Sequence, residues 1–181
     1  MTFAAMNLDQ RIKEAMVDVH DFPKPGIVYK DITPIFQDPH LLNDILDGMV
    51  EECRGLNIQA IVGLESRGFL LAVPLSLRLG IPFVMVRKKG KLPRECHTVN
   101  YDLEYGSSAI EVHKDALKPG MRVLIHDDVL ATGGTAEAAA RLVQMAGAEV
   151  AMFQFLVELS FLKGMERMLP FTSHVTTFAR F

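Results

Sequence analysis

The feature that most limits the fold of this chain is an alternation of apolar runs with helical segments. Four runs are almost continuously apolar, at residues 58–64, 81–86, 122–126 and 148–159. A strand that is apolar at every position is buried on both faces, which is typical of parallel sheets covered by helices. We therefore predict an α/β fold with a central, mostly parallel sheet flanked by helices.

The N-terminal part of the chain follows a different pattern. Leu8, Ile12 and Met16 recur at helical spacing, so we expect a helix over residues 7–19. Several prolines and a glycine follow, and they leave room only for a short extended piece at residues 27–32. A helix should then begin after Asp38, which precedes Pro39 and is a suitable N-cap.

Residues 87–107 contain little apolar sequence between two expected strands. We expect them to form a long exposed loop, and such a loop in a compact domain is usually functional. Further along the chain, residues 108–115 are typical of a half-exposed strand, residues 160–169 of a short helix and residues 174–181 of a last strand.

Composition excludes several classes of protein. The 181 residues favour a single domain over residues 1–181, and the net charge of −3 argues against a general nucleic-acid binder. No apolar run is long enough to span a membrane, and we find no signal peptide. Cys53 and Cys96 show neither a disulfide framework nor a zinc spacing, so the cytoplasm is the expected compartment. The six histidines match no metal-binding pattern, and we expect no dedicated protein metal site.

A Gly/Thr turn runs from the strand at 122–126 into an Ala-rich helix. Glycines let the backbone approach a ligand closely, and a helix N-terminus offers free N–H groups. The turn therefore predicts a cradle for a monophosphate, although a plain strand–turn–helix joint would use similar residues. Its members are Ala131, Thr132, Gly133, Gly134 and Thr135.

Two adjacent carboxylates, Asp127 and Asp128, precede this turn. They could simply cap the helix or lie in solvent, since Asp is common at turns. A sugar phosphate would explain both features, because its phosphate fits the turn and its hydroxyls can donate to the carboxylates. Negative charge beside a sugar carbon also stabilises an oxocarbenium-like transition state more than the ground state.

Three polar stretches follow expected strands, at residues 65–68, 87–91 and 127–135. Ligands of open α/β sheets bind outside the carboxyl ends of the strands, so we expect these stretches to converge. The basic stretch 87–91 could be only a solvated charge run, but its place at a strand end favours a role in binding an anion.

The stretch "VLIHDDVLATGGT", residues 123–135, resembles the phosphoribosyl-diphosphate signature of the type I phosphoribosyltransferases. The segments "FPKPGIVYKDITPIF", "GLESRGFLLAVPLSLRLGIPFVMVRKKGKLP" and "YDLEYG" resemble the adenine-specific branch of that family. Together they cover most of residues 20–160 in the expected order. The resemblance implies the type I phosphoribosyltransferase fold, with a small hood at about 20–36 and a mobile lid loop at about 87–107.

The same resemblance implies a set of site residues. The turn 131–135 would bind the 5′-phosphate, and Asp127 and Asp128 would hold the ribose hydroxyls. The leaving diphosphate would be bound by Glu65, Ser66, Arg67, Arg87, Lys88 and Lys91. The hood would contact adenine through Val28 and Lys30, and the catalytic residues would be Glu104, Tyr105 and Arg67, with Glu104 handling the proton of the base.

The activity implied is transfer of a phosphoribosyl group from phosphoribosyl diphosphate to adenine, giving AMP and pyrophosphate. Mg²⁺ would be carried on the diphosphate, and the family is typically homodimeric. A phosphoribosyltransferase for another base and a non-catalytic phosphoribosyl-binding regulator are the alternatives. A bare phosphate-binding module is weaker, because it leaves the hood and lid unexplained. We expect neither nucleic acid nor a membrane as a partner.

Two positions depart from the family pattern. Lys30 stands where the family usually has arginine, which weakens a bidentate or stacked contact to the base but is harmless if only the backbone there reads adenine. His126 stands where the signature usually has an apolar residue. We expect it to be a hydrogen-bonded core or interface histidine; as a minor alternative, it tunes the charge of the neighbouring acids near neutral pH.

Overall fold

A seven-stranded sheet forms the centre of the computed structural model, which describes residues 6–103 and 106–181. Five strands run parallel, and β6 and β5 add an antiparallel pair beside β4. The predicted central, mostly parallel sheet is therefore confirmed. In spatial order the strands are β5 (Cys96–Leu103), β6 (Gly106–His113), β4 (Phe83–Lys88), β3 (Ala60–Leu64), β7 (Arg122–Leu130), β8 (Glu149–Glu158) and β9 (Val175–Arg180).

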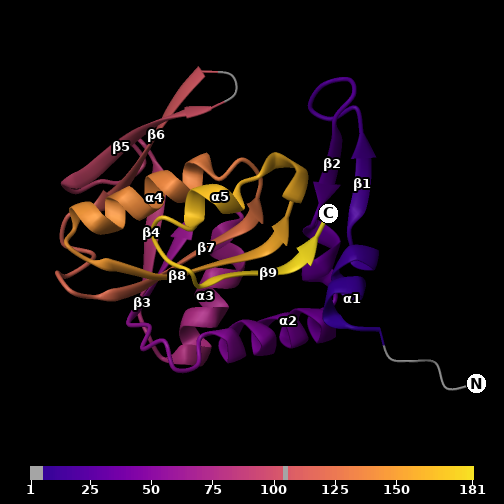
Figure 1. Cartoon of the computed structure of the whole chain (residues 1–181), viewed down its shortest axis with the longest axis horizontal. Helices are drawn as coiled ribbons and strands as arrows, with labels where there is room; N and C mark the ends of the chain where they lie inside the picture. The colour runs from indigo at the N-terminus through magenta and orange to yellow at the C-terminus, as the bar shows by residue number, and fades with distance from the viewer. Residues whose placement is uncertain (1–5, 104–105) are drawn as a thin grey trace, which may run out of the picture.

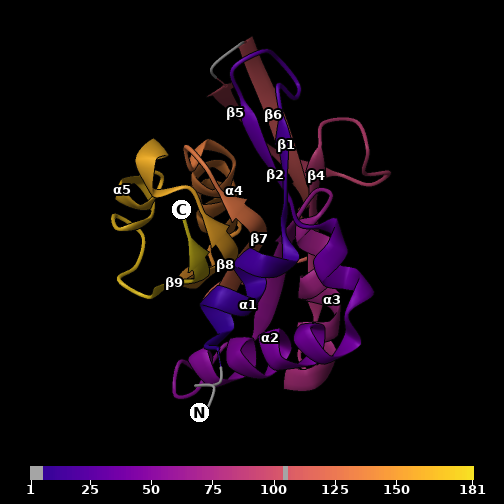
Figure 2. The same ribbon diagram turned by 90° about the vertical axis from the view of Figure 1, so that its right-hand side faces the viewer.

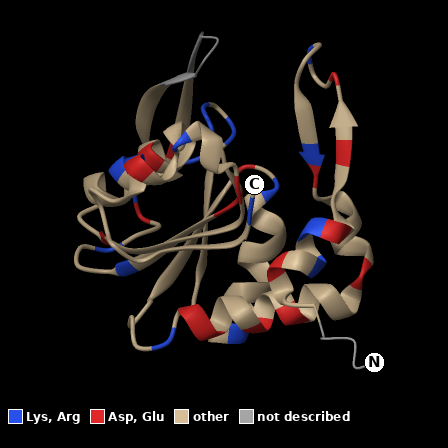
Figure 3. Cartoon of the chain, turned by 45° about the vertical axis from the view of Figure 1, so that its right-hand side comes forward, with Lys and Arg blue, Asp and Glu red and all other residues tan. Residues whose placement is uncertain are grey.

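Helices cover both faces of this sheet (Figures 1 and 2). One face packs against α1 (Leu8–Ala15), α2 (Pro39–Glu52) and α3 (Gly68–Leu79). The other face packs against α4 (Gly134–Met145), together with the short α5 (Met165–Met168), which follows the 3-10 turn η2 (Ser160–Leu162). Two hydrophobic cores result, one on each side of the sheet. Charged residues lie along the helices, whereas the inner strands are mostly uncharged (Figure 3).

Local sequence signals account for several element boundaries. The Asp38 carboxylate accepts hydrogen bonds from the backbone N–H groups of His40 and Leu41 at 2.9 and 3.1 Å, so it caps α2 as expected. Helix α3 ends at Gly80, which adopts a left-handed conformation with φ of 67°. Every residue of β3 is buried, as its continuous apolar run predicts.

A separate two-stranded sheet consists of β1 (Val17–His20) and β2 (Val28–Asp31), followed by the 3-10 turn η1 (Thr33–Gln37). It overlaps the hood expected at about 20–36 but begins earlier, and we call it the hood below. The short extended piece expected at 27–32 is confirmed. The helix expected over 7–19 is too long, because α1 ends at Ala15 and residues 17–20 pair with β2 instead. Helical spacing of apolar residues could not reveal that pairing, which is a contact with a distant segment.

The segment expected to be a long loop is largely a β-hairpin. Residues 96–103 of β5 pair antiparallel with residues 106–113 of β6, and the two strands project from the sheet edge (Figure 1). The segment is poor in apolar residues because the hairpin is only half-covered, with α4 packing against part of it. No helix in the described ranges is long and apolar enough to cross a lipid bilayer.

Candidate functional site

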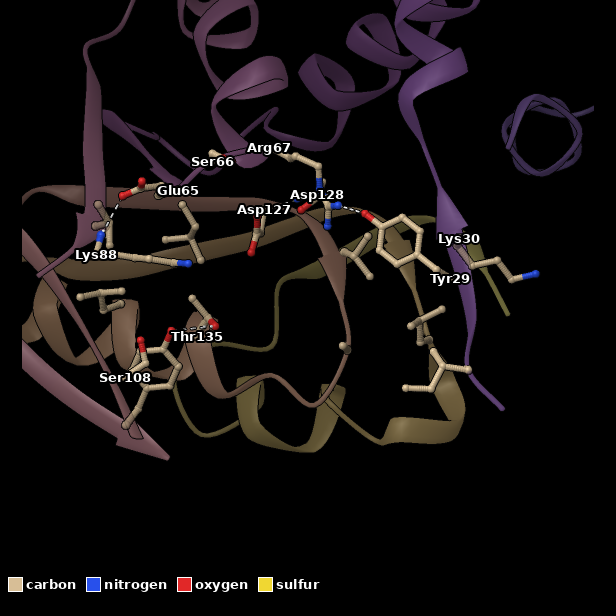
Figure 4. A pocket seen from close by; sticks show the side chains of 18 of the residues that line it. Tyr29, Lys30, Glu65, Ser66, Arg67, Lys88, Ser108, Asp127, Asp128 and Thr135 are labelled. Atoms are coloured by element: carbon tan, nitrogen blue, oxygen red, sulfur yellow. Dashed lines mark hydrogen bonds and ion pairs between the residues drawn. The ribbon is translucent and has the colours of Figure 1, made fainter. Parts of the chain in front are cut away.

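A cavity of about 590 Å³ opens where β3, β4 and β7 end (Figure 4). This is the position expected for a ligand site in an α/β sheet. The stretches after these strands meet there as predicted, and hood strand β2 forms a further wall. From the predicted set the lining includes Val28, Lys30, Glu65, Ser66, Arg67, Lys88, Asp127, Asp128, Ala131 and Thr135.

The turn between β7 and α4 lines a smaller recess of about 70 Å³ that also contacts Asp127. All five predicted cradle residues, 131–135, line it. Gly133 has φ of 81°, a conformation that L residues rarely adopt, and α4 begins after it without a side-chain cap. The N–H groups of the first helical turn are therefore left for an anion, and the recess suits a monophosphate.

Sequence reasoning missed Gly164, which supports this turn from behind. A Cβ atom built on Gly164 would lie 2.2 Å from the carbonyl oxygen of Ala131. The contact is reciprocal, since a Cβ on Gly133 would lie 2.8 Å from the carbonyl oxygen of Gly164. The two backbones therefore interlock, and the segment before α5 determines where the turn lies. The only feature of the sequence that could have indicated this contact was a single glycine within residues 160–169.

The two carboxylates at the end of β7 lie side by side in the cavity wall. Asp128 is buried, and its backbone N–H donates to the Asp127 carboxylate at 3.0 Å. Burial and the charge of Asp128 raise the pKa of Asp127 well above its usual value. Asp127 retains some exposure to the cavity, so solvent moderates this effect. The pair concentrates negative charge directly beside the recess lined by residues 131–135.

Arg67 compensates part of that charge. Its Nε donates to the Asp128 carboxylate at 2.5 Å, and its Nη1 donates to the hydroxyl of Tyr29. The Arg67 side chain remains 40% exposed, so the guanidinium can still meet a ligand in the cavity. Tyr29 belongs to hood strand β2 and was not among the predicted residues. The contact therefore connects the hood to the acid pair (Figure 4).

Glu65 hydrogen-bonds to two neighbouring residues, Arg87 and Lys88, and offers no donor to an anion. Its carboxylate accepts from the backbone N–H of Lys88 at 2.8 Å and from the Arg87 guanidinium at 3.3 Å. Burial alone would raise the pKa of Glu65, but these bonds keep it below its usual value. Lys88 extends along the cavity toward Asp127 in Figure 4, whereas Arg87 and Lys91 lie outside the cavity lining. The peptide bond between Glu65 and Ser66 is cis.

The two hood residues that were predicted to contact adenine, Val28 and Lys30, differ in what their side chains contact. Val28 lines the cavity, but the ammonium of Lys30 points away from it and pairs with Asp18 at 2.7 Å (Figure 4). The backbone of β2 therefore faces the cavity without help from the Lys30 charge. This arrangement agrees with the alternative in which lysine at this position does not read the base through its side chain.

The hairpin β5–β6 supplies cavity residues that sequence reasoning also missed. Tyr101 and Ser108 line the cavity, and the hydroxyls of Thr135 and Tyr101 are 3.3 Å apart. A hydroxyl-bearing strand has no sequence signature of its own, which explains the omission. Glu104 and Tyr105, predicted to be catalytic, lie outside the described residues. Among the residues that are described, no group of three or more His, Cys, Asp and Glu could hold a metal ion.

His126 is completely buried beneath the acid pair. Neither of its ring nitrogens has a hydrogen-bond partner of good geometry within the described chain, so the expectation of a hydrogen-bonded core histidine is right about burial and wrong about bonding. Burial lowers the pKa of His126 to about 4, and the charge of Asp128 and the nearby backbone of Gln154 offset only part of that effect. The imidazole is therefore neutral near pH 7 and does not change charge between pH 6 and 8.

This low pKa predicts sensitivity to acid. Above the ordinary histidine pKa of 6.5, the folded and unfolded states are both neutral at His126 and stability is unaffected. Below it, only the unfolded state gains the proton, so stability falls by about 1.4 kcal/mol per pH unit until about pH 4. His126→Met should remove that slope, gaining about 2 kcal/mol on the wild type between about pH 7.5 and about pH 5.

Urea unfolding at the two pH values measures this difference. His174→Met is the matched control, because His174 is exposed. Parallel pH dependences for the wild type and His126→Met would show that the buried imidazole does not carry the acid sensitivity.

Comparison with known proteins agrees with this geometry. Residues 35–168 match the phosphoribosyl transferase domain family. The chain is 47% identical over 168 residues to an adenine phosphoribosyltransferase of Cytophaga hutchinsonii, covering 93% of each chain. The crystal structure of adenine phosphoribosyltransferase from Rhodothermus marinus aligns with a TM-score of 0.90 and 48% identity, covering 96% of this chain and 98% of that one.

The Saccharomyces cerevisiae adenine phosphoribosyltransferase, complexed with an imino-altritol bisphosphate and adenine, aligns with a TM-score of 0.88 and 42% identity, covering 94% of this chain and 98% of that one. The matches extend over nearly the whole chain and include the cavity, the cradle and the hood. With this coverage and identity, the chain belongs to the phosphoribosyltransferase family and, within it, to the adenine phosphoribosyltransferases.

Proposed function

We propose that this protein transfers the 5-phosphoribosyl group of phosphoribosyl diphosphate to adenine, giving AMP and pyrophosphate in purine salvage. The observation that carries the proposal is the junction of the cradle 131–135, the acid pair and the hood wall at one cavity. A phosphate, a ribose and a flat base would occupy these three parts in order. The yeast relative was solved with adenine and a bisphosphate, a ligand pair of matching chemistry.

The arrangement suits a reaction that builds positive charge on the sugar. The C1′–O bond breaks, the diphosphate leaves with the electron pair, and adenine N9 supplies the pair for the new C1′–N bond before a ring proton departs. Asp127 and Asp128 face the sugar position, so their negative charge stabilises the transition state more than the ground state. Arg67 and Lys88 provide positive charge for the leaving diphosphate, and Arg87 and Lys91 would reach it only after moving toward the cavity.

Mg²⁺ fits this donor set as an ion carried on the diphosphate. The cavity lining offers two adjacent carboxylates and the hydroxyls of Ser66 and Thr135 rather than a closed cage of protein ligands. Mg²⁺ is usually held in this way, by substrate phosphates, water and few carboxylates. When bound, it would neutralise charge on the diphosphate and improve it as a leaving group.

The β5–β6 hairpin is the proposed lid, because Tyr101 and Ser108 already reach the cavity from it. Closure would exclude water, which would otherwise hydrolyse a ribosyl cation. Glu104 would handle the proton of the base, and Tyr105 would help close the site. For Glu104→Ala we expect turnover to fall more than the apparent KM rises, and a change confined to KM would contradict the proton-handling role.

The proposed assembly is a homodimer. Helix α3 leaves Leu70, Val73 and Leu77 exposed on one stripe, and Met85 of the neighbouring β4 is also exposed. An apolar stripe beside the site is typical of an interface. Sedimentation of the wild type and of Leu77→Glu tests it, with a monomeric wild type contradicting the assembly. The cytoplasm is the proposed compartment because both cysteines are free thiols.

The base is tested by incubating the protein with phosphoribosyl diphosphate, Mg²⁺ and adenine, hypoxanthine, guanine or orotate in parallel. AMP from adenine alone is the expected result. Turnover of another base would assign the chain to a sister activity. Binding of phosphoribosyl diphosphate without any turnover would favour a regulator, the remaining alternative.

A further inference from the structure

The ammonium of Lys30 points away from the cavity that its residue lines and is held by two other side chains. This ammonium lies 2.7 Å from the Asp18 carboxylate and 4.3 Å from the ring centroid of Phe181. Only 19% of the Lys30 side chain is exposed. Lys13 of α1 lies over the same ring at 5.6 Å. A cation over an aromatic face is attracted by the ring quadrupole, and more strongly when the pair is shielded from water.

Phe181 is attached to the opposite wall of the cavity. Its backbone N–H donates to the carbonyl of Glu158 at 2.9 Å, and its carbonyl accepts from the N–H of Ser160 at 2.8 Å. These two residues flank Leu159, which lines the cavity. Phe181 is therefore hydrogen-bonded through its backbone to the same short segment, 158–160, that places Leu159 in the cavity wall.

The hood has no strand pairing with the main sheet in the described chain, so side chains must hold it in place. Tyr29 and Lys30, which are adjacent on β2, hold the hood from opposite faces of the strand, because successive side chains of a strand alternate between its faces. Tyr29 turns toward the cavity and meets Arg67, while Lys30 turns away (Figure 4). The Lys30 ammonium lies over the ring of Phe181. Val28, next to Tyr29 in the chain, is part of the cavity wall.

We propose that Lys30 is a positioning residue: with Asp18 and Phe181 it forms a latch that sets the distance between β2 and Leu159, the two walls that receive the base. This inference rests on the proposed function and deepens it, because it assigns base affinity to a contact that does not touch the base. The cavity parts that hold the phosphate and the ribose lie on β7 and α4, away from the latch. The latch should therefore affect adenine far more than phosphoribosyl diphosphate, which the hood reaches only through the contact of Tyr29 with Arg67.

Lys30→Met keeps the length of the side chain and removes its charge, and Phe181→Leu keeps an apolar side chain and removes the ring. We expect each to raise KM for adenine by roughly three- to tenfold, which lies within the range that a cation–π contact supplies. The kcat and the KM for phosphoribosyl diphosphate should stay within about twofold of wild type, since both variants keep the cradle residues and the contact of Tyr29 with Arg67. Lys30→Arg should retain wild-type KM for adenine, because a guanidinium also binds an aromatic face.

The double variant Lys30→Met with Phe181→Leu separates a latch from two independent effects. A latch predicts that the double variant is no worse than the poorer single variant, since either change already breaks the contact. Matched controls are Lys118→Met and Phe161→Leu, which make the same changes at exposed positions outside the cavity lining. Both should match wild type.

Once the wild type is shown to convert adenine, three results would overturn the latch. The first is an unchanged KM for adenine in both single variants, and the second is strictly multiplicative effects on that KM in the double variant. The third is an effect of Lys30→Met on the KM for adenine with no effect of Phe181→Leu. The last would place the ammonium on the base itself. Failure of the wild type to convert adenine is a different outcome, because it contradicts the proposed function. Hydrogen exchange of the amides at 28–31 gives a readout without turnover, and both single variants should exchange faster there.

Discussion

Asp128→Asn is expected to lower kcat/KM by about 10²–10³-fold, the loss typical of removing one electrostatic group from a transition state. The carboxylate is buried beside Asp127 and accepts from Arg67, so asparagine keeps its shape and removes its charge where, in the proposed reaction, the sugar would become positive. Arg67 also loses its anionic partner. Both effects act on the transition state more than on substrate binding, so kcat should fall more than KM rises.

Steady-state rates at saturating adenine, with phosphoribosyl diphosphate varied, measure this loss. Asp115→Asn is the matched control, because Asp115 pairs with Arg94 on the exposed surface and should leave the rate unchanged. A loss of less than tenfold for Asp128→Asn, or an equal loss in the control, would remove Asp128 from the charge-stabilising role.

Gly164→Ala is expected to disable the turn 131–135, the proposed phosphate site, although residue 164 does not line the recess. Its backbone has φ of −60° and ψ of −28°, which alanine adopts easily, so conformation is not the obstacle. The new methyl would meet the backbone carbonyl of Ala131, and a backbone atom cannot rotate away as a side chain can. The turn must move, and a displacement of about 1 Å at a binding site can cost about 10²-fold in rate.

We expect kcat/KM for phosphoribosyl diphosphate to fall by about 10²-fold, and the free energy of unfolding to fall by about 1–3 kcal/mol from overpacking. Titration with inorganic phosphate or ribose 5-phosphate measures the binding defect separately from turnover. Glu166→Ala, an exposed change on the same short helix, should leave both quantities as in wild type. Normal phosphate affinity in Gly164→Ala would mean that the turn does not depend on this backbone contact.

The pattern of apolar residues predicts most of the central sheet. Fully apolar strands such as β3 have one favourable environment, between two helical layers, and capping at Asp38 and the stop at Gly80 are local effects. The predicted boundaries of helices and loops were wrong where pairing with another strand determined the secondary structure. Residues 17–20 became β1 by pairing with β2, and residues 96–103 became a strand by pairing with β6.

The residues of the candidate site fall into the same two groups, those predictable from local sequence and those determined by tertiary contacts. The sequence by itself determined the acid pair, the cradle at 131–135 and the convergence of three strand ends, because each depends on residues adjacent in the chain or on the fold class. Only the tertiary structure decided that Tyr29 bonds Arg67, that Gly164 buttresses the cradle, and that Lys30 faces Phe181 rather than the cavity. These contacts join residues far apart in sequence, and a side chain's partner across such a distance is decided by packing, for which a linear pattern carries no signal.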